Sequence, residues 1–184
     1  INRILRTFEV IDNAEGLSKL DMIEIFTKTG EKHKTHRKGG RSLFGKGLPD
    51  TLFSPIIEIG SGEVHSIKEN KYACAIFRKN KKNEEIVDIK PDNDIEQDAT
   101  NQIRKKLKIE KGNGNLIKFK LAEKTTFPRD DTMIRDITKF YMLRFINQNP
   151  KRRIKIRFTN EGKTKYETTI NYYKPSDLEQ IGNK

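Results

Sequence analysis

The sequence has one cysteine, no tryptophan and no apolar run long enough to cross a bilayer. The single cysteine, Cys74, excludes a disulfide within the chain, and its strand-like context YACAIF favours a small buried hydrophobe. Because a chain without disulfides fits a reducing environment, we expect a cytoplasmic protein. The lack of a long apolar run argues against a membrane-spanning helix, and we expect no membrane partner.

Aromatic residues are also scarce, at 8% of the chain, whereas charged residues make up 35%. Lysine and arginine number 38 against 26 aspartates and glutamates, which gives a formal net charge of +12. This surplus favours acidic partners, namely nucleotides, nucleic acid or an anionic surface. The length of 184 residues suits one domain with at most a small appendage.

Glycine is concentrated in one stretch, GGRSLFGKGLPDTLFS, from 39 to 54. Four of the twelve glycines lie here, and Pro49 follows them at once. Because proline is favoured in the first turn of a helix, the stretch predicts a flexible loop that ends on a helix N-terminus, a construction that suits a phosphate group. The spacing is that of neither a Walker loop nor a dinucleotide fingerprint, and a glycine-rich surface turn is the alternative interpretation.

A second informative stretch lies near the start of the chain. Thr7 to Ile11 is typical of a short strand, and DNAEGL follows from 12 to 17. Ser18 then suits the N-cap of a helix from Lys19 to about Thr27. An acidic residue between a strand and a helix predicts a carboxylate on the floor of a pocket, where it can accept a hydrogen bond from an exocyclic amine such as that of adenine.

Together with GNGNLIKF from 112 to 119, these two stretches resemble the glycine boxes and the closing strand of the GHKL ATPase superfamily, which includes DNA gyrase B, heat-shock chaperones, histidine kinases and mismatch-repair MutL. The order and rough spacing match over residues 7 to 121. The resemblance implies an ATP-binding domain, with ATP and Mg²⁺ as cofactors. It also implies that the nucleotide drives rearrangement or homodimerisation, with other domains of a larger protein as partners.

The resemblance assigns roles to individual residues. Asp12 would accept the adenine amino group, Gly16 would let the chain pass close to the base, and Asn115 stands where the family has threonine. The second glycine box would line the phosphates with backbone N–H groups. The full set implied for ATP is Asp12, Asn13, Gly16, Gly40, Phe44, Gly45, Lys46, Gly47, Leu48 and Asn115.

Three features depart from the family pattern. Ala14 replaces the middle glycine of the first box, and Asn115 replaces threonine; both changes are mild. The family also has a helix before the first box, whose glutamate activates water and whose asparagine holds Mg²⁺. Ile1 to Arg6 is too short for that helix, so we expect a fragment that binds ATP, and we assign no catalytic residue and no metal ligand.

The remaining patterns predict the other elements. The basic segment before the second box resembles the family's lid loop, and its His33 and His36 lack the partners of a metal site, so we expect them to be solvated. Strands are predicted at Ile56 to Ile59, Tyr72 to Phe77, Glu85 to Ile89, Leu116 to Leu121, Ile154 to Phe158 and Tyr166 to Tyr172. Helices are predicted from Ile95 to about Leu107 and from Asp130 to about Asn147.

These elements predict an α+β fold, a two-layer α/β sandwich of the Bergerat type, with a mostly antiparallel mixed sheet and helices on one face. We expect residues 1–127 to form a nucleotide-binding core. Residues 128–175 would complete the same domain with a helix and a hairpin, and residues 176–184 would form a tail.

A nucleic-acid-binding module without nucleotide chemistry is the main alternative function. Four basic clusters support it, at 37–41, 78–82, 104–108 and 151–157, although a single basic cluster is usually only a solvated face. The strand KRRIKIR is the best candidate, since its cations alternate with isoleucine and would project from one face of a sheet. Its candidate contact residues are Lys151, Arg152, Arg153, Lys155 and Arg157. A purely structural interaction domain is a third hypothesis, and it predicts no nucleotide binding.

Overall fold

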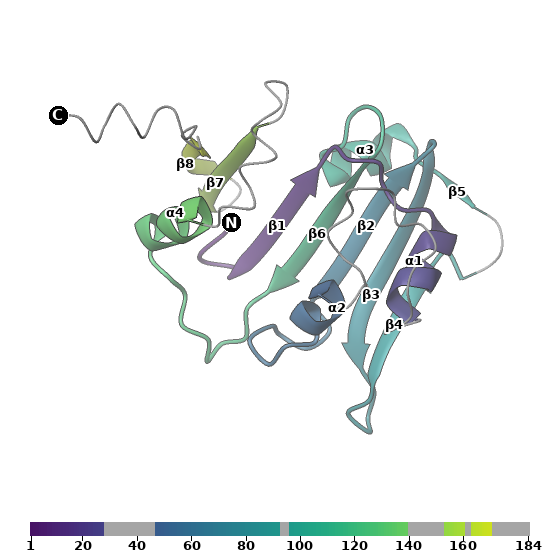
Figure 1. The fold of residues 1–184 in the computed structure, drawn as a ribbon, viewed down its shortest axis with the longest axis horizontal. Helices are drawn as coiled ribbons and strands as arrows, with labels where there is room; N and C mark the ends of the chain where they lie inside the picture. The colour runs from purple at the N-terminus through teal and green to yellow at the C-terminus, as the bar shows by residue number, and fades with distance from the viewer. Residues whose placement is uncertain (28–46, 93–95, 140–152, 161–162, 171–184) are drawn as a thin grey trace, which may run out of the picture. The chain divides into compact units, whose positions relative to one another are not determined.

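A computed structural model describes residues 1–27, 47–92, 96–139, 153–160 and 163–170 (Figure 1). The fold is α+β, with antiparallel strand pairing and few helices, as the sequence predicted. Contacts within the chain divide it into two compact units. The larger unit is Thr7–Thr125, and the smaller unit joins Ile1–Arg6 to Thr126–Lys184.

The larger unit is built on one antiparallel sheet with the strand order β1-β6-β2-β3-β4 (Figure 1). Its strands are β1 (Thr7–Asp12), β2 (Gly62–Lys68), β3 (Lys71–Lys79), β4 (Glu85–Lys90) and β6 (Gly114–Lys120), and the short β5 (Gln97–Asp98) pairs with β3. In the register, Asn115 of β6 lies opposite Asp12 of β1 on one side and opposite Ser66 of β2 on the other. The pairing therefore brings the first and third sequence motifs side by side.

One face of this sheet packs against α1 (Lys19–Thr27) and α2 (Gly47–Leu52). Met22 and Phe26 of α1 and Leu52 of α2 form a core cluster with Val64 and Phe77 of the sheet. The rings of Phe26 and Phe77 meet edge to face, with centroids 5.3 Å apart. Burial of each such side chain contributes roughly 1.5–3 kcal/mol, so this cluster is a main source of stability for the unit.

The opposite face is covered at one end by α3 (Asn101–Leu107). Leu107 packs in a second core cluster with Ile67 of β2 and Leu116 of β6. Because successive side chains of a strand point to opposite faces, Ile67 and Val64 lie on different sides of β2. The described helices of this unit therefore lie on both faces of the sheet, whereas the sequence predicted one.

Two sequence-based assignments of local structure are wrong. Residues 56–59 form turns around a single β-bridge of Ile57 with Leu121 rather than a strand, and the strand begins later, at Gly62. A Cβ on Gly62 would lie 3.2 Å from Leu52 Cβ, so this glycine serves the packing of α2 and not a turn. The helix predicted from Ile95 instead begins at Asn101, because Gln97–Asp98 pairs with β3 and the Thr100 side chain caps the helix by accepting from Ile103 N–H. Ile95 itself lies outside the described residues.

The smaller unit contains α4 (Asp130–Lys139) and the hairpin of β7 (Ile154–Asn160) and β8 (Lys163–Ile170). The start of the chain belongs here because Asn2 forms a parallel bridge with Thr159. In addition, Arg3 Nε lies 2.6 Å from Asp130 Oδ1 and its guanidinium stacks 4.7 Å from the Phe127 ring centroid. The predicted helix and hairpin are both present, and residues 140–152 and 171–184 lie outside the described part.

Candidate functional site

The side chains of Asp12 and Asn115 are in direct contact at the ends of β1 and β6. The Asn115 amide nitrogen donates to Asp12 Oδ1 at 3.0 Å and lies 3.3 Å from Oδ2. The backbone N–H of Ala14 donates to the same Oδ1 at 3.0 Å, while Asn13 is exposed in the turn. Because Oδ1 already has two donors, Oδ2 has the greater remaining capacity to accept from a ligand. The structure thus brings together two residues that the sequence motifs assigned to the base.

Ser66 of β2 extends this contact into the sheet. Its side chain is fully buried, and its hydroxyl donates to Asn115 Oδ1 at 2.8 Å. The backbone N–H of Leu17 in turn donates to Ser66 Oγ at 2.5 Å. Because Ser66 supplies a donor to the amide oxygen, the amide nitrogen of Asn115 faces Asp12. We call Asp12, Asn115 and Ser66 the carboxylate network.

Ser66 lies in a strand that was not predicted, because the predicted strands stop at Ile59 and resume at Tyr72. A usable signal was present. In the segment GEVHSIK, Val64 and Ser66 are two positions apart and so share a strand face. A small polar residue on the apolar face of a buried strand needs a hydrogen-bond partner, and here that partner is Asn115.

Two glycines allow close backbone approaches around the carboxylate network. A Cβ on Gly114, the residue before Asn115, would lie 2.3 Å from the Asp12 carbonyl oxygen. Gly16 has a φ of +76°, and a Cβ there would lie 2.2 Å from the Ile67 carbonyl oxygen. Both positions therefore require glycine. Gly16, which was expected to pass close to a base, passes close to the backbone of β2.

The glycine-rich stretch enters the described part at Gly47, where α2 begins. Pro49 lies in the first turn of that helix, as predicted, and Leu48 packs against the core cluster. Gly47 is exposed, and a Cβ on it would meet open space. Four of the residues predicted to bind ATP lie outside the described part, namely Gly40, Phe44, Gly45 and Lys46. His33 and His36 also lie outside it.

The other face of β2 carries a second polar cluster, centred on His65. Its Nε2 lies 2.9 Å from Glu63 Oε2, its Nδ1 lies 2.9 Å from Tyr72 Oη, and Cys74 is directly opposite in the register. Burial alone would lower the pKa of His65, but the hydrogen bonds with Cys74 and Glu63 outweigh it and raise that pKa to about 9. Near neutral pH both ring nitrogens are therefore donors, so His65 is unsuited to act as a general base.

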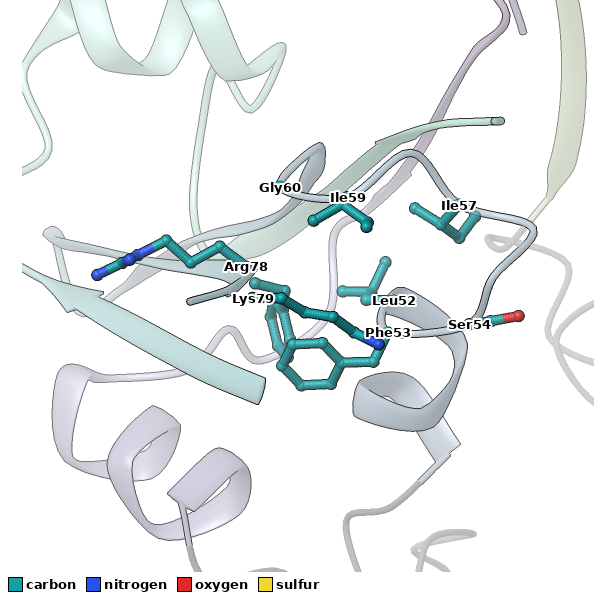
Figure 2. A pocket seen from close by; sticks show the side chains of 9 residues that line it. Leu52, Phe53, Ser54, Ile57, Ile59, Gly60, Arg78 and Lys79 are labelled. Atoms are coloured by element: carbon teal, nitrogen blue, oxygen red, sulfur yellow. The ribbon is translucent and has the colours of Figure 1, made fainter. Parts of the chain in front are cut away.

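Figure 2 shows a hollow between the segment that follows α2 and the end of β3. Leu52, Phe53 and Ile57 form its apolar wall, and its space amounts to at most ≈ 200 Å³, part of which is open solvent. Ligand pockets typically offer roughly 300–1,000 Å³, so it is small for a nucleotide. It also lies at the Gly62 end of β2, whereas Ser66 lies toward the other end. The hollow is therefore separate from the carboxylate network.

No group of three His, Cys, Asp or Glu side chains within the described ranges is placed to hold a metal ion. The Mg²⁺ that the resemblance implies thus has no assigned ligand in these ranges. In the described ranges, three of the four basic clusters are partly used in internal contacts, and in the cluster at 151–157 Lys155 and Arg157 pair with Glu167. Arg78 pairs with Asp88, Lys108 pairs with Glu9, and Arg104 donates to carbonyl groups of the loop after α3.

No protein-family model matches this chain, and no curated protein is detectably similar to it. The expected resemblance to GHKL ATPases therefore rests on the sequence motifs alone. Across the described ranges, no helix combines the length and the apolar character needed to cross a membrane.

Proposed function

We propose that the larger unit binds ATP through the carboxylate network. The observation that carries the proposal is the hydrogen bond between Asn115 and Asp12, two residues 103 positions apart that come from separate motifs. Ala14 N–H and the Asn115 amide both donate to Oδ1, which orients the carboxylate. Oδ2 lies 3.3 Å from the same Asn115 nitrogen and keeps capacity to accept a further hydrogen bond from a ligand. A carboxylate oxygen held in this way suits a single N–H donor such as the adenine amino group.

This chemistry favours adenine over guanine. Guanine carries a carbonyl oxygen, an acceptor, where adenine carries its amino group. An acceptor facing Oδ2 of Asp12 would be repelled, because neither atom has a proton to share. We therefore expect GTP to bind more weakly than ATP.

The position of the network also supports the proposal. Ser66 shares a strand face with Val64, so the network lies on the sheet face that packs against α1 and α2. Gly47 begins α2 on this face, and we propose that the triphosphate with its Mg²⁺ reaches the glycine-rich stretch. We propose that the unit is a GHKL-type domain of the Bergerat type, in which the sheet face that bears α1 and α2 carries the nucleotide. Hydrolysis in a larger protein, with domain rearrangement or dimerisation, is part of the same proposal.

The test is calorimetric titration of the 184-residue chain with Mg-ATP, comparing it with the variant Asp12→Asn. The variant keeps an oxygen for Ala14 and Asn115 but replaces one acceptor with an amide donor. We expect the affinity for ATP to fall by about 10- to 100-fold, which corresponds to the free energy of one hydrogen bond to a charged group.

Asp98→Asn is the matched control, since it removes the same charge from a side chain that is 69% exposed and pairs with Lys71 at the surface. We expect this control to bind ATP like the unmodified chain. Equal ATP affinity in Asp12→Asn and the unmodified chain would show that the carboxylate network is not the base site. Thermal unfolding of each variant separates loss of binding from loss of structure.

A further inference from the structure

The β7–β8 hairpin of the smaller unit is a two-stranded ribbon with one cationic side. Arg153, Lys155 and Arg157 are exposed at alternate positions, whereas Ile156 and Phe158, at the intervening and following positions, are only 6% and 2% exposed. This alternation follows from the two-residue period of a strand and confirms that the cations of KRRIKIR project from one face in its described part. Lys151 and Arg152 lie outside the described residues.

Glu167 is the single carboxylate on the described part of the ribbon, and it lies in the middle of the cationic side. It is opposite Arg157 in the register, with Arg157 Nε at 2.7 Å and Lys155 Nζ at 3.4 Å from its carboxylate oxygens. Lys155 and Arg157 remain 56% and 55% exposed. An exposed ion pair contributes only about 0–1 kcal/mol, so a phosphate can replace Glu167 as the partner of these cations at little cost.

We propose that this cationic side binds the backbone of duplex DNA, with Arg153, Lys155 and Arg157 contacting phosphates and Glu167 as a counter-charge that weakens binding. The inference is independent of ATP binding. The major groove of B-DNA, about 12 Å wide, admits a two-stranded ribbon. A net charge of +12 on the whole chain would draw DNA toward the protein.

Single-stranded nucleic acid fits this surface less well, because it is usually bound by stacking on exposed aromatic rings. Tyr166 is exposed on the ribbon, but it lies opposite Phe158 and therefore on the other side from Arg157. Duplex RNA also fits less well, because its major groove is too deep and narrow for a ribbon. The described cations of the other basic clusters are in part engaged by Asp88 and Glu9.

The experiment is fluorescence anisotropy of a labelled duplex DNA of about 20 base pairs with the full 184-residue chain, over roughly 50 to 200 mM salt. Three phosphate contacts predict a slope of log affinity against log salt of about −3, a loss of about 40-fold over this range. The double variant Lys155→Gln with Arg157→Gln should reduce the slope by about 2. Glu167→Gln should instead strengthen binding, and a gain of affinity cannot come from unfolding.

The matched control is Lys81→Gln with Lys82→Gln, which removes the same charge from exposed residues between β3 and β4. We expect its salt slope to equal that of the unmodified chain. The proposal is overturned if this control loses as much affinity as the ribbon variant, because binding would then follow net charge alone. It is equally overturned if Glu167→Gln does not strengthen binding, or if duplex RNA or single-stranded DNA binds as tightly as duplex DNA.

Discussion

Ser66 and His65 are neighbours on β2, yet they belong to clusters on opposite faces of the sheet. Ser66 is fully buried and holds Asn115 toward Asp12, while His65 is 8% exposed and contacts Glu63 and Tyr72. The alternation of a strand allows one dipeptide to serve both clusters. A substitution of Ser66 should therefore affect the candidate ATP site, and a substitution of His65 should affect the His65 cluster alone.

The His65 cluster predicts a dependence of stability on pH. The pKa of His65 is raised from 6.5 to about 9 in the folded chain, so the stabilisation from its protonated form is complete below pH 6.5 and is lost as the pH rises to about 9. The difference between these two pKa values corresponds to about 3 kcal/mol in the free energy of unfolding. The free energy of unfolding, measured in urea at several pH values, should therefore fall over this range.

The variant His65→Gln should lose most of this pH dependence, because it lacks the group that titrates. His33 and His36 remain in the variant and supply the background titration. The charged or titratable groups that act on this cluster are Glu63, Tyr72, Cys74, Lys106 and Lys118. An unchanged pH dependence in the variant would show that His65 is not protonated by its contacts in the folded chain.

At the scale of elements, α1 and α3 differ in how well the local sequence defines their ends. The bounds of α1 were predicted correctly, because Ser18 and Asp21 form a reciprocal cap: Asp21 N–H donates to Ser18 Oγ at 3.1 Å and Ser18 N–H donates to Asp21 Oδ2 at 2.8 Å. In contrast, the residue that caps the C-terminus of α3 is Lys108, which has the left-handed conformation with a φ of 60°. Glycine is the usual residue at such a position.

This cap predicts that Lys108→Gly stabilises the larger unit. A left-handed conformation costs roughly 1–2 kcal/mol for a residue with a Cβ, and the gain is reduced by the greater freedom of glycine in the unfolded chain. We expect a net increase of about 0.5 kcal/mol in the free energy of unfolding, measured in urea. Because the substitution also removes the ion pair with Glu9, the variant Glu9→Gln serves as the control for that pair. A Lys108→Gly variant less stable than Glu9→Gln would contradict the prediction.

At the scale of the whole molecule, the chain consists of two compact units. All strands of the larger sheet lie within Thr7–Thr125, and so do both core clusters. We therefore expect a chain of residues 7–125 to unfold cooperatively and to bind ATP with the same affinity as the full chain. Circular dichroism with thermal unfolding and calorimetric titration check this. A fragment without a cooperative transition would instead favour the sequence-based hypothesis that residues 128–175 complete one domain.

Local patterns were sufficient for much of the fold. The N-cap signal of Ser18 before α1, the apolar runs of β1, β3, β4 and β6, and the alternating cations of β7 predicted those elements close to their observed ends. The motifs also selected Asp12 and Asn115 as a pair of interest. Each of these signals is short in range, because caps and strand periods involve residues only a few positions apart.

The tertiary structure alone decided the features that depend on distant residues. Ser66 joins the site because it meets Asn115 from 49 positions away, and position 62 favours glycine because Leu52 packs over it. Likewise, Glu167 lies among the cations of β7 only because the hairpin register places it opposite Arg157. A local pattern cannot reveal such contacts, because their free energy appears only when the sheet brings the two segments together.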